Sequence, residues 1–302
     1  MTVLPIDESH PAYAKFFECF VAGASLQDIY SESEEGFGVR HRDAPDDPIR
    51  LKKQTDACRV QFMRQFEHMR NLAEPIDRFV GLGGKEVLDF GCGTGALGVA
   101  LALRGGRVTC VDPTQTSLDA CVWRARYFGL SDSQIRPLRI GVEPGLPFGD
   151  CSFDMVACNS VFEFIPARRN EYVRELARVI RPGGYLVIST ENGLYPVDYY
   201  TRKVFPLWRR ATMVRMNVPY GVTYFELRRW LRDSGRRFRD LSALNWFNSI
   251  DHLVQRRRAS KQVIVPAMLS GANAVLKSVC RLLGLPSQIL LPYTTFIFQA
   301  PR

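Results

Sequence analysis

Between residues 85 and 190 the chain alternates short apolar runs with stretches of helical periodicity, and this alternation restricts the fold more than any other feature of the sequence. Runs such as KEVLDF, RVTCVD and FDMVAC are almost continuously apolar, as strands covered on both faces of a sheet are. Segments of helical length, such as ARRNEYVRELARVI, separate them. Strands that alternate with helices form right-handed crossovers, so the pattern predicts a doubly wound α/β fold with a mostly parallel sheet.

The flanking segments add further elements to this prediction. Apolar residues recur at steps of three and four from Cys58 to Val80, which predicts an amphipathic helix before the first strand. A second helix is predicted in TYFELRRWLRDSG, with Thr223 as its N-cap and Glu226 at the capping-box position. RRFRDLSAL and YTTFIFQA are strand-like and bring the predicted sheet to seven strands. Residues 1–45 are mixed in character and include the acidic run SESEEGFG, so their pattern assigns no individual element.

The composition is that of a globular protein, with 46% hydrophobic and 24% charged residues. The eight cysteines form no CxxC pair, and several lie in strand-like runs, so we expect buried, reduced thiols rather than disulfides or a metal site. The first residues show no secretory signal. The apolar, charge-free stretch QVIVPAMLSGANAVL near the C-terminus has fifteen residues, fewer than the roughly 20 that span a bilayer. These features predict a cytoplasmic protein.

The positive charge is concentrated in one part of the chain. The formal net charge is +9, and the segment from Glu191 to Ser260 alone carries an excess of eight positive charges. Such a segment is a solvated basic face or a surface that meets phosphate, an acidic acceptor or anionic lipid. From Arg256 to Leu285, basic residues flank an apolar segment, which is typical of a membrane-surface helix and, more often, of a lid or dimer helix. A peripheral membrane contact therefore stays open, and no oligomeric state is predicted.

The segment VLDFGCGTGALG places four glycines within eight residues directly after a buried strand. Glycines allow the backbone to approach a ligand closely, and the helix that follows directs its N-terminus at the same place, so a nucleotide-like ligand is expected. GTGALG satisfies the dinucleotide fingerprint G-x-G-x-x-G, while GCGTG has the shorter G-x-G-x-G pattern. The loop alone leaves the choice of cofactor open.

Neighbouring motifs favour one family. Asp89 stands two residues before the first glycine, Asp112 ends the second strand, LPFGDCSFDMV leads into the fourth and RVIRPGGYLVIST into the fifth. In this order they resemble class I S-adenosylmethionine (SAM)-dependent methyltransferases, most of all the small-molecule group called methyltransferase type 11. The resemblance covers residues 80–190 well and 223–240 more loosely. It implies a Rossmann-like fold with SAM as the cofactor.

The resemblance also implies a division of the chain. Residues 1–80 would form an N-terminal helical extension or cap, and residues 81–190 the SAM-binding core. Residues 191–302 would complete the sheet and carry aromatic and basic insertions on the substrate side.

A set of cofactor contacts follows from the same resemblance. A carboxylate can accept hydrogen bonds from both ribose hydroxyls, and Asp112 stands at the strand end where the family does this. Asp89 would face the amino-acid portion of the cofactor. Where the family usually has an acid for the adenine amino group, this chain has Val142, with Glu143 one position further. The implied cofactor-binding residues are Asp89, Gly91, Cys92, Gly93, Gly95, Asp112, Pro113, Glu143 and Asn159.

The catalytic residue is less well defined. The methyl group of SAM is already activated, so transfer needs mainly placement, although a hydroxyl acceptor benefits from a general base. Many relatives carry Glu-His after the fourth strand, whereas here Phe164 follows Glu163. The candidates are therefore His41 and His252 as bases, and Tyr200 in an aromatic-rich insertion that would cover the acceptor.

These observations predict a methyltransferase for a small molecule, with hydrophobic, lipid-linked and phosphate-bearing acceptors all compatible and O-methylation favoured over N- or C-methylation. One alternative is an NAD(P)-dependent oxidoreductase that uses the overlapping glycine fingerprint. Another is a SAM-binding partner subunit without activity of its own. Nucleic acid is not expected as a partner, because CNSVFEF after the fourth strand lacks the Asn-Pro-Pro-Tyr type of motif used on flipped bases.

Overall fold

The computed structural model describes most of the sheet and its helices. It covers residues 6–30, 48–165, 168–193, 221–242 and 293–302, with 275, 278–280, 282–283, 285–286, 289 and 291. The chain divides into two compact units, residues 1–142 and 143–302. This boundary falls inside the predicted core of residues 81–190, and the three-part division remains a prediction.

The sheet has seven strands in the order β3-β2-β1-β4-β5-β7-β6. The pairs β1–β2, β2–β3 and β4–β5 are parallel, and β7 runs antiparallel to β5 and to β6. The predicted seven-stranded, mostly parallel sheet with flanking helices is confirmed. The strands are β1 (Glu86–Phe90), β2 (Arg107–Asp112), β3 (Ile135–Arg139), β4 (Phe153–Asn159), β5 (Ile180–Glu191), β6 (Arg239–Asp240) and β7 (Tyr293–Gln299).

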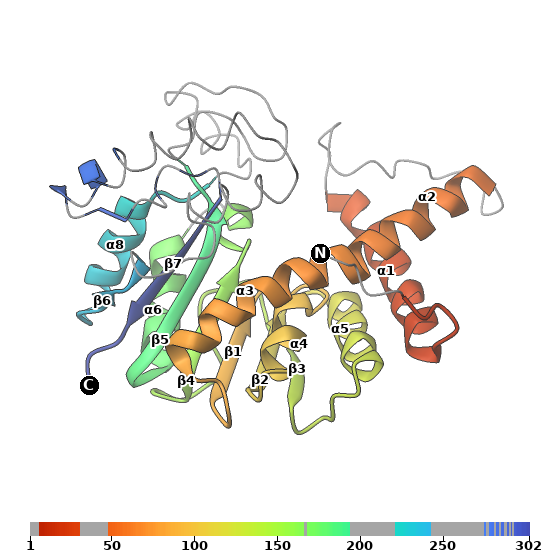
Figure 1. Ribbon diagram of the computed structural model, residues 1–302, viewed down its shortest axis with the longest axis horizontal. Helices are drawn as coiled ribbons and strands as arrows, with labels where there is room; N and C mark the ends of the chain where they lie inside the picture. Colours follow the sequence, from red (N-terminus) through yellow and green to blue (C-terminus); the bar gives the residue numbers. More distant parts are fainter. Residues whose placement is uncertain are drawn as a thin grey trace. The chain divides into compact units, whose positions relative to one another are not determined.

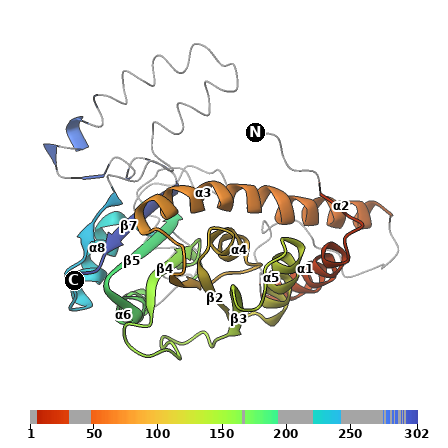
Figure 2. The same cartoon turned by 60° about the horizontal axis from the view of Figure 1, so that its bottom comes forward.

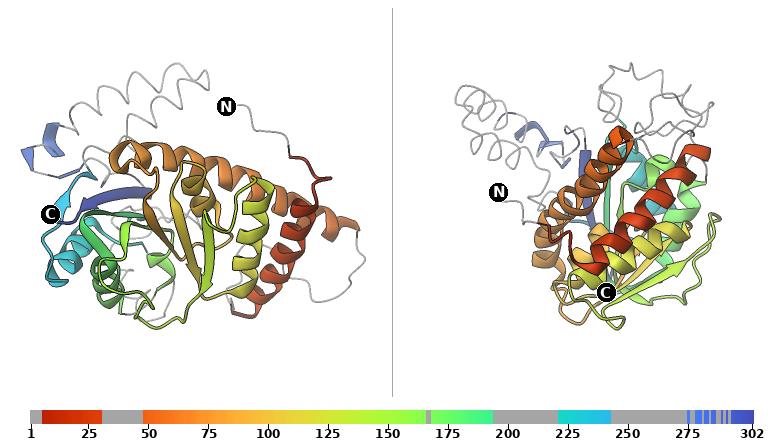
Figure 3. Two further views of the ribbon diagram at one scale, coloured as in Figure 1. Left: turned by 90° about the horizontal axis from the view of Figure 1, so that it is seen from below. Right: turned by 90° about the vertical axis from the view of Figure 1, so that its right-hand side faces the viewer.

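The first unit joins three parallel strands to a row of helices. Val87, Leu88 and Val111 are fully buried, as the apolar strand sequences predict. Helix α3 contacts α4, α4 contacts α5, and α5 contacts α1; Figures 2 and 3 show α1 (red) lying along α5 (yellow-green). The helical elements are α1 (Pro11–Tyr30), α2 (Pro48–Arg59), the π-helix η1 (Val60–Arg64), α3 (Gln65–Val80), α4 (Ala96–Ala102) and α5 (Gln115–Tyr127).

Helix α1 lies within the N-terminal helical extension implied for residues 1–80, although the sequence analysis assigned no individual element to residues 1–45. Its Tyr13 and Phe16 are buried and meet the ring of Phe62 edge-on, with ring centroids 5.2 and 4.7 Å apart. Phe62 also contacts Tyr127 at the end of α5. Tyr13, Phe16 and Phe20 recur at helical spacing, but this short pattern gains meaning only from the rings that it packs against. The predicted helix from Cys58 to Val80 is confirmed, with the π-helical turn η1 inside it.

The second unit contains the antiparallel edge of the sheet. Figure 1 shows β7 (dark blue) running beside β5 (green), and helices α6 and α8 pack against each other. The capping box is confirmed: the Glu226 N–H donates to Thr223 Oγ1 over 3.1 Å, and the Thr223 N–H donates to Glu226 Oε2 over 3.0 Å. The helices are the 3₁₀ turn η2 (Phe162–Phe164), α6 (Arg169–Val179) and α8 (Tyr224–Asp233).

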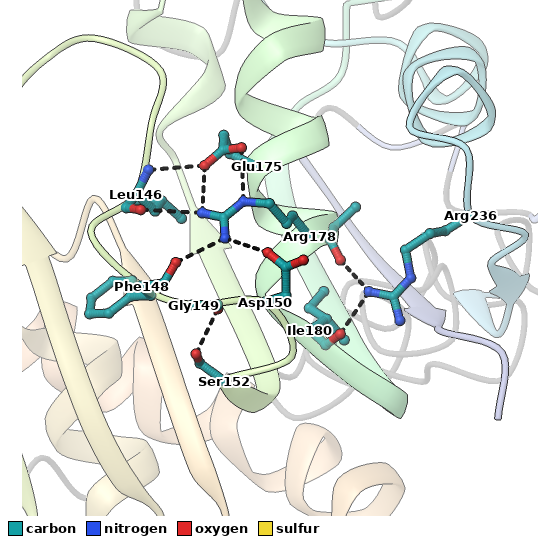
Figure 4. A network of polar contacts seen from close by, with 10 residues as sticks. Leu146, Phe148, Gly149, Asp150, Ser152, Glu175, Arg178, Ile180 and Arg236 are labelled. Carbon is teal, nitrogen blue, oxygen red and sulfur yellow. Dashed lines mark hydrogen bonds and ion pairs between the residues drawn. The ribbon is translucent and has the colours of Figure 1, made fainter.

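One arginine holds the LPFGD segment before β4 in place. Arg178, in the last turn of α6, donates from Nη1 to the carbonyl oxygen of Phe148 and from Nη2 to that of Leu146, over 2.9 and 3.2 Å (Figure 4). Its other donors meet the carboxylates of Glu175 and Asp150. Several charge-assisted bonds from one planar guanidinium fix the direction from which the chain enters β4.

Other sequence predictions concern the cysteines and the C-terminal half. All eight cysteines are described, and each is a free thiol. Of the helices in the described ranges, none combines the length and the apolar character needed to cross a membrane. Most of the aromatic insertion after β5, and of the basic segment from residue 246 to 290, lies outside the described residues.

Candidate functional site

The glycine loop joins β1 to α4 through left-handed backbone. Gly91, Gly93 and Gly95 have φ angles of +68°, +50° and +74°, which residues with a Cβ rarely adopt. The N–H groups of Gly91 and Cys92 both donate to the carbonyl oxygen of Val111, over 2.9 and 3.0 Å. The loop is therefore folded across the end of the neighbouring strand β2.

The glycines of this loop have two different kinds of surroundings. A Cβ on Gly95 would lie 2.2 Å from the Cys121 sulfur, and one on Gly98 would lie 2.4 Å from the Cys110 sulfur. At Gly93, by contrast, nothing in the described part of the chain lies within 4 Å of a Cβ. The loop is thus tightly packed on buried thiols at its helical end and open at Gly93, where its backbone is accessible to a ligand.

Asp112 links the loop to the end of β2. Its Oδ2 accepts the Gly93 N–H over 3.0 Å, and its Oδ1 accepts the Thr114 N–H over 2.9 Å. Burial raises the pKa of this carboxyl, and the two backbone donors partly oppose that shift. The Thr114 side chain also bonds this carboxyl. A carboxylate has about four lone-pair sites, so Asp112 keeps acceptor capacity for a ligand beside the open part of the loop.

Asp89 lies beneath the first turn of α4. It is 1% exposed, and its Oδ2 lies 2.9 Å from the position of a Cβ on Gly98, whose backbone N–H bonds the carboxyl. Burial raises its pKa to about 8, so at neutral pH the group is largely protonated. Oδ2 is buried and has no hydrogen-bond partner among the described residues. Oδ2 can therefore form a hydrogen bond to a polar group of a ligand that enters the loop, directly or through water.

Arg124 supports the loop from behind. The side chain is fully buried on α5, and its Nη2 donates to Thr94 Oγ1 in the loop and to the Gln61 carbonyl oxygen, over 3.2 and 3.0 Å. Its guanidinium lies over the rings of Phe16 and Phe62. Burial lowers its pKa to about 10. The sequence analysis missed this residue, although Arg124 lies three residues after buried Cys121 on the apolar side of its helix.

In the second unit, a polar group occupies the edge where β4 and β5 end. Asn159 closes β4, and its Oδ1 accepts the hydroxyl proton of Tyr293 over 3.1 Å. Ser160 Oγ lies 2.5 Å from the same tyrosine oxygen. Ser160 and Tyr293 were not predicted as site residues, because they are 133 positions apart and lie in no recognisable motif.

Glu163 is buried near the same strand ends. Its Oε2 accepts the Thr190 hydroxyl and its Oε1 accepts the Glu191 N–H, both over 3.2 Å. Burial raises its pKa to about 7, while the bonds to Glu191 and Thr190 and the charge of Arg169 oppose the shift. The Glu163 side chain is 0% exposed, so its carboxyl does not face solvent. Its two hydrogen bonds stabilise the end of β5.

Two of the predicted cofactor residues lie on the surface. Pro113 is exposed, and its carbonyl oxygen accepts a bond from Arg139. The Glu143 side chain is 76% exposed and forms an ion pair with Arg168, which also binds Glu171. An adenine contact for Glu143 remains a prediction.

The catalytic candidates His41, His252 and Tyr200 lie outside the described residues, and their roles remain predictions. Within the described ranges, no group of three or more His, Cys, Asp or Glu side chains is arranged to hold a metal ion.

Similarity to known proteins identifies the family. The model of the methyltransferase domain matches residues 88–188. The chain is 37% identical over 117 residues to a ubiquinone biosynthesis O-methyltransferase of Paracidovorax citrulli, covering 39% of this chain and 48% of that one. It is 32% identical over 178 residues to the protein of that name from Pseudomonas putida, covering 57% and 72%. The chain belongs to the class I SAM-dependent methyltransferases.

This methyltransferase also matches solved structures at low identity. A SAM-dependent methyltransferase from Mesorhizobium loti is 17% identical, covers 72% of this chain and 92% of its own, and has a TM-score of 0.47. The predicted family and SAM as cofactor are confirmed, and the alternative of an NAD(P)-dependent oxidoreductase is set aside. The chain spans about half of the Paracidovorax relative, at 48% of its length.

The first unit of the methyltransferase fits SAM in its chemistry. Asp112 has acceptor capacity for ribose hydroxyls, and among the described residues nothing crowds Gly93 and nothing bonds the buried Asp89 Oδ2. These groups match the ribose and the amino-acid portion of SAM. The sequence analysis named all three residues, and it missed Thr94, Thr114 and Arg124, which hold the loop in shape.

Proposed function

We propose that this methyltransferase transfers the methyl group of SAM to a hydroxyl of a small, lipid-linked acceptor. Relatives that match over 178 residues are named ubiquinone biosynthesis O-methyltransferases, and ubiquinone is a lipid-linked ring compound. This supports an aromatic hydroxyl on an apolar tail as the acceptor. A phenolic hydroxyl is more acidic than an alcohol, so it needs less help from a base.

The observation that carries the cofactor side of the proposal is the bond from the Gly93 N–H to Asp112 Oδ2. This bond joins the two groups that SAM requires. The Asp112 carboxylate suits the ribose of the cofactor, and the backbone at Gly93 suits its amino-acid portion. In the proposed complex Asp112 accepts the ribose hydroxyls, and the backbone from Gly91 to Gly95 lies along the amino-acid portion. Asp89 serves the same portion through Oδ2, which has no hydrogen-bond partner in the described part of the chain.

The chemistry of the step is simple. SAM, when bound, supplies a methyl group on a sulfonium sulfur that leaves as a neutral thioether. The protein then has to place the acceptor oxygen in line with that methyl group and keep water away, which alone gives a large rate increase. Asn159, at the end of β4, is proposed to lie at the methionine end of the cofactor.

The test has two parts. Calorimetry with S-adenosylhomocysteine measures the cofactor site directly, and a radiolabelled methyl group from SAM, extracted into organic solvent, measures transfer to phenols and catechols with alkyl chains of increasing length. We expect S-adenosylhomocysteine to bind and transfer to rise with chain length. Transfer to amines but not to hydroxyls would contradict the choice of acceptor, and a protein that binds S-adenosylhomocysteine but methylates neither would be a partner subunit.

A further inference from the structure

Three thiols of the first unit meet at the glycine loop. Cys92 belongs to the loop itself, whereas Cys110 lies on β2 and Cys121 on α5. A Cβ on Gly95, which caps α4, would lie 2.2 Å from the Cys121 sulfur. A Cβ on Gly98, in the first turn of α4, would lie 2.4 Å from the Cys110 sulfur. The Cys92 thiol hydrogen-bonds both of these sulfurs, so the three form one cluster that the proposed methyl transfer does not use.

The hydrogen bonds of this cluster converge on Cys121. Its sulfur accepts from the thiols of both Cys110 and Cys92. The Cys92 sulfur also lies 3.4 Å from the carbonyl oxygen of Gly93, a second acceptor for its proton. Hydrogen bonds from the two thiols, together with the charge of Arg124, hold the pKa of Cys121 well below its usual range, although burial opposes the shift. Cys121 is therefore the thiol of the cluster best suited to be a thiolate.

The buried guanidinium of Arg124 supports the same assignment. Its Nε and Nη1 have no hydrogen-bond partner among the described residues. The negative charges that act on it are those of thiols, Cys121 first, rather than those of carboxylates. A buried cation is costly unless an anion compensates it. A thiolate at Cys121 supplies that charge within the fold.

Exposure distinguishes the loop cysteine from the other two. Cys92 is half-buried, whereas Cys110 and Cys121 are fully buried. A small oxidant from solvent therefore meets the cluster at Cys92. The thiolate is the form of cysteine that reacts with oxidants. Because Cys92 hydrogen-bonds Cys121, transfer of its proton along this bond places the thiolate on the sulfur that the oxidant can reach.

We propose that Cys92 and Cys121 are a peroxide-sensitive thiol pair, whose oxidation to a disulfide weakens cofactor binding. The Cys92 thiolate attacks hydrogen peroxide, the O–O bond breaks, and a sulfenic acid and hydroxide form. The Cys121 thiol then attacks the Cys92 sulfur. The S–S bond forms as the S–O bond breaks, and the oxygen leaves as water with the Cys121 proton. The two sulfurs lose two electrons, and one peroxide is reduced to water and hydroxide.

The disulfide requires the loop to change its shape. Its sulfurs are about 2.05 Å apart, closer than in any hydrogen bond, so Cys92 has to move toward α5. Cys92 stands between Gly91 and Gly93, whose φ angles of +68° and +50° define the loop in its reduced form. Cofactor binding should therefore weaken on oxidation and recover on reduction. The inference goes beyond the proposed acceptor and rests on the proposed function only in taking this loop as the cofactor site.

The experiment compares each protein with itself before and after oxidation. Wild type, C121S and C151S are treated with hydrogen peroxide, catalase removes the excess, and calorimetry measures the affinity for S-adenosylhomocysteine. Cys151 is exposed and lies in the second unit, so C151S controls for oxidation of an accessible thiol outside the cluster. Mass spectrometry of peptides from the alkylated, unreduced proteins locates each disulfide.

We expect a disulfide between Cys92 and Cys121 in oxidised wild type and C151S. Both should then bind S-adenosylhomocysteine about tenfold more weakly than before, the effect of about one lost hydrogen bond to the ligand. Dithiothreitol should restore the affinity. C121S should keep the affinity that it has before treatment. S-adenosylhomocysteine at about ten times its Kd should slow disulfide formation in the wild type about tenfold, because only the ligand-free loop reacts.

Four results would overturn the inference: no disulfide between Cys92 and Cys121 in oxidised wild type, an equal loss of affinity in C121S, a loss that dithiothreitol does not reverse, or no protection by S-adenosylhomocysteine. Disulfide location and protection need only the wild type, so they decide the matter even if C121S does not fold. Untreated wild type that binds no S-adenosylhomocysteine would instead refute the proposed cofactor site. The two failures are therefore distinguishable.

Discussion

The glycine loop of the first unit and the polar edge of the second unit are built in opposite ways. The loop from Gly91 to Gly95 uses neighbouring residues and backbone groups, and the thiols of Cys110 and Cys121 fill the space that its glycines leave. The polar edge joins Asn159 and Ser160 to Tyr293, on a strand that comes more than 130 residues later. The comparison teaches that the glycine loop is a local motif, while the polar edge exists only after distant strands have paired.

The largest effect should follow from filling the packed end of the loop. G95V places side-chain atoms where Cys121 lies 2.2 Å from the Cβ position, on backbone with φ +74°. Overpacking and left-handed strain together should cost about 3–5 kcal/mol in the free energy of unfolding and abolish S-adenosylhomocysteine binding. Urea unfolding and calorimetry measure the two quantities.

A matched control separates strain from overpacking. Gly129 has a similar φ of +72°, but nothing in the described ranges lies within 4 Å of its Cβ position. G129A should cost only about 1 kcal/mol and leave binding unchanged. If G95V bound S-adenosylhomocysteine like the wild type, the loop would not be the cofactor site.

The next effect concerns the buried carboxyl of the second unit. The pKa of Glu163 is raised from 4.5 to about 7, so the folded protein binds its proton more tightly than the unfolded chain does. Its contribution to stability is complete below pH 4.5 and is lost as the pH rises through about 7. On the order of 3 kcal/mol of the free energy of unfolding is involved. E163Q keeps the shape without the charge, so its advantage over the wild type should grow from pH 5 to pH 8.

Urea unfolding of both proteins at the two pH values measures this difference. Asp89, whose pKa is also raised, is present in both and cancels. E171Q serves as the control, because Glu171 is only half-buried and its hydrogen bond to the guanidinium of Arg168 lowers its pKa. An equal difference between wild type and E163Q at both pH values would show that Glu163 does not titrate in this range.

Replacing Asp112 in the first unit should change cofactor binding more than the free energy of unfolding. D112N replaces an acceptor that takes the Gly93 and Thr114 N–H groups, and its amide turns a donor toward one of them. We expect S-adenosylhomocysteine to bind about 10- to 100-fold more weakly, since bonds to charged groups are worth about 1.5–3 kcal/mol. Calorimetry of D112N and of D119N, whose carboxylate bonds Gln115 on the same helix, gives the comparison. Equal affinities for D112N and wild type would remove Asp112 from the site.

The smallest effect tests a local motif within the second unit. T223A removes the cap that accepts the Glu226 N–H at the start of α8 and should lower the free energy of unfolding by about 1 kcal/mol. E226Q keeps a capping-box residue and should cost less. Neither should alter S-adenosylhomocysteine affinity, which calorimetry checks. A loss of affinity in T223A would mean that α8 is coupled to the cofactor site.

Much of the fold was predictable because its signals are local. The apolar runs of β1, β2 and β4, the helix stripe from Cys58 to Val80 and the capping box at Thr223 each depend on residues within a few turns or one strand. Helix α1 was not assigned as an individual element, because its aromatic spacing gains meaning only from the rings of Phe62 and Tyr127 that it meets. The same holds for Arg124, a charged residue that an aromatic and thiol environment buries.

The sequence by itself determined the parallel sheet, the left-handed glycine loop and the two acids beside it, because strand burial and positive φ angles select residue types at each position. Only the tertiary structure decided which polar groups meet. It left Asp89 Oδ2 without a partner among the described residues, shifted the pKa of Glu163 toward neutrality, and brought Tyr293 against Ser160. The physical reason is that burial and long-range hydrogen bonds depend on neighbours from distant parts of the chain, and no local pattern encodes them.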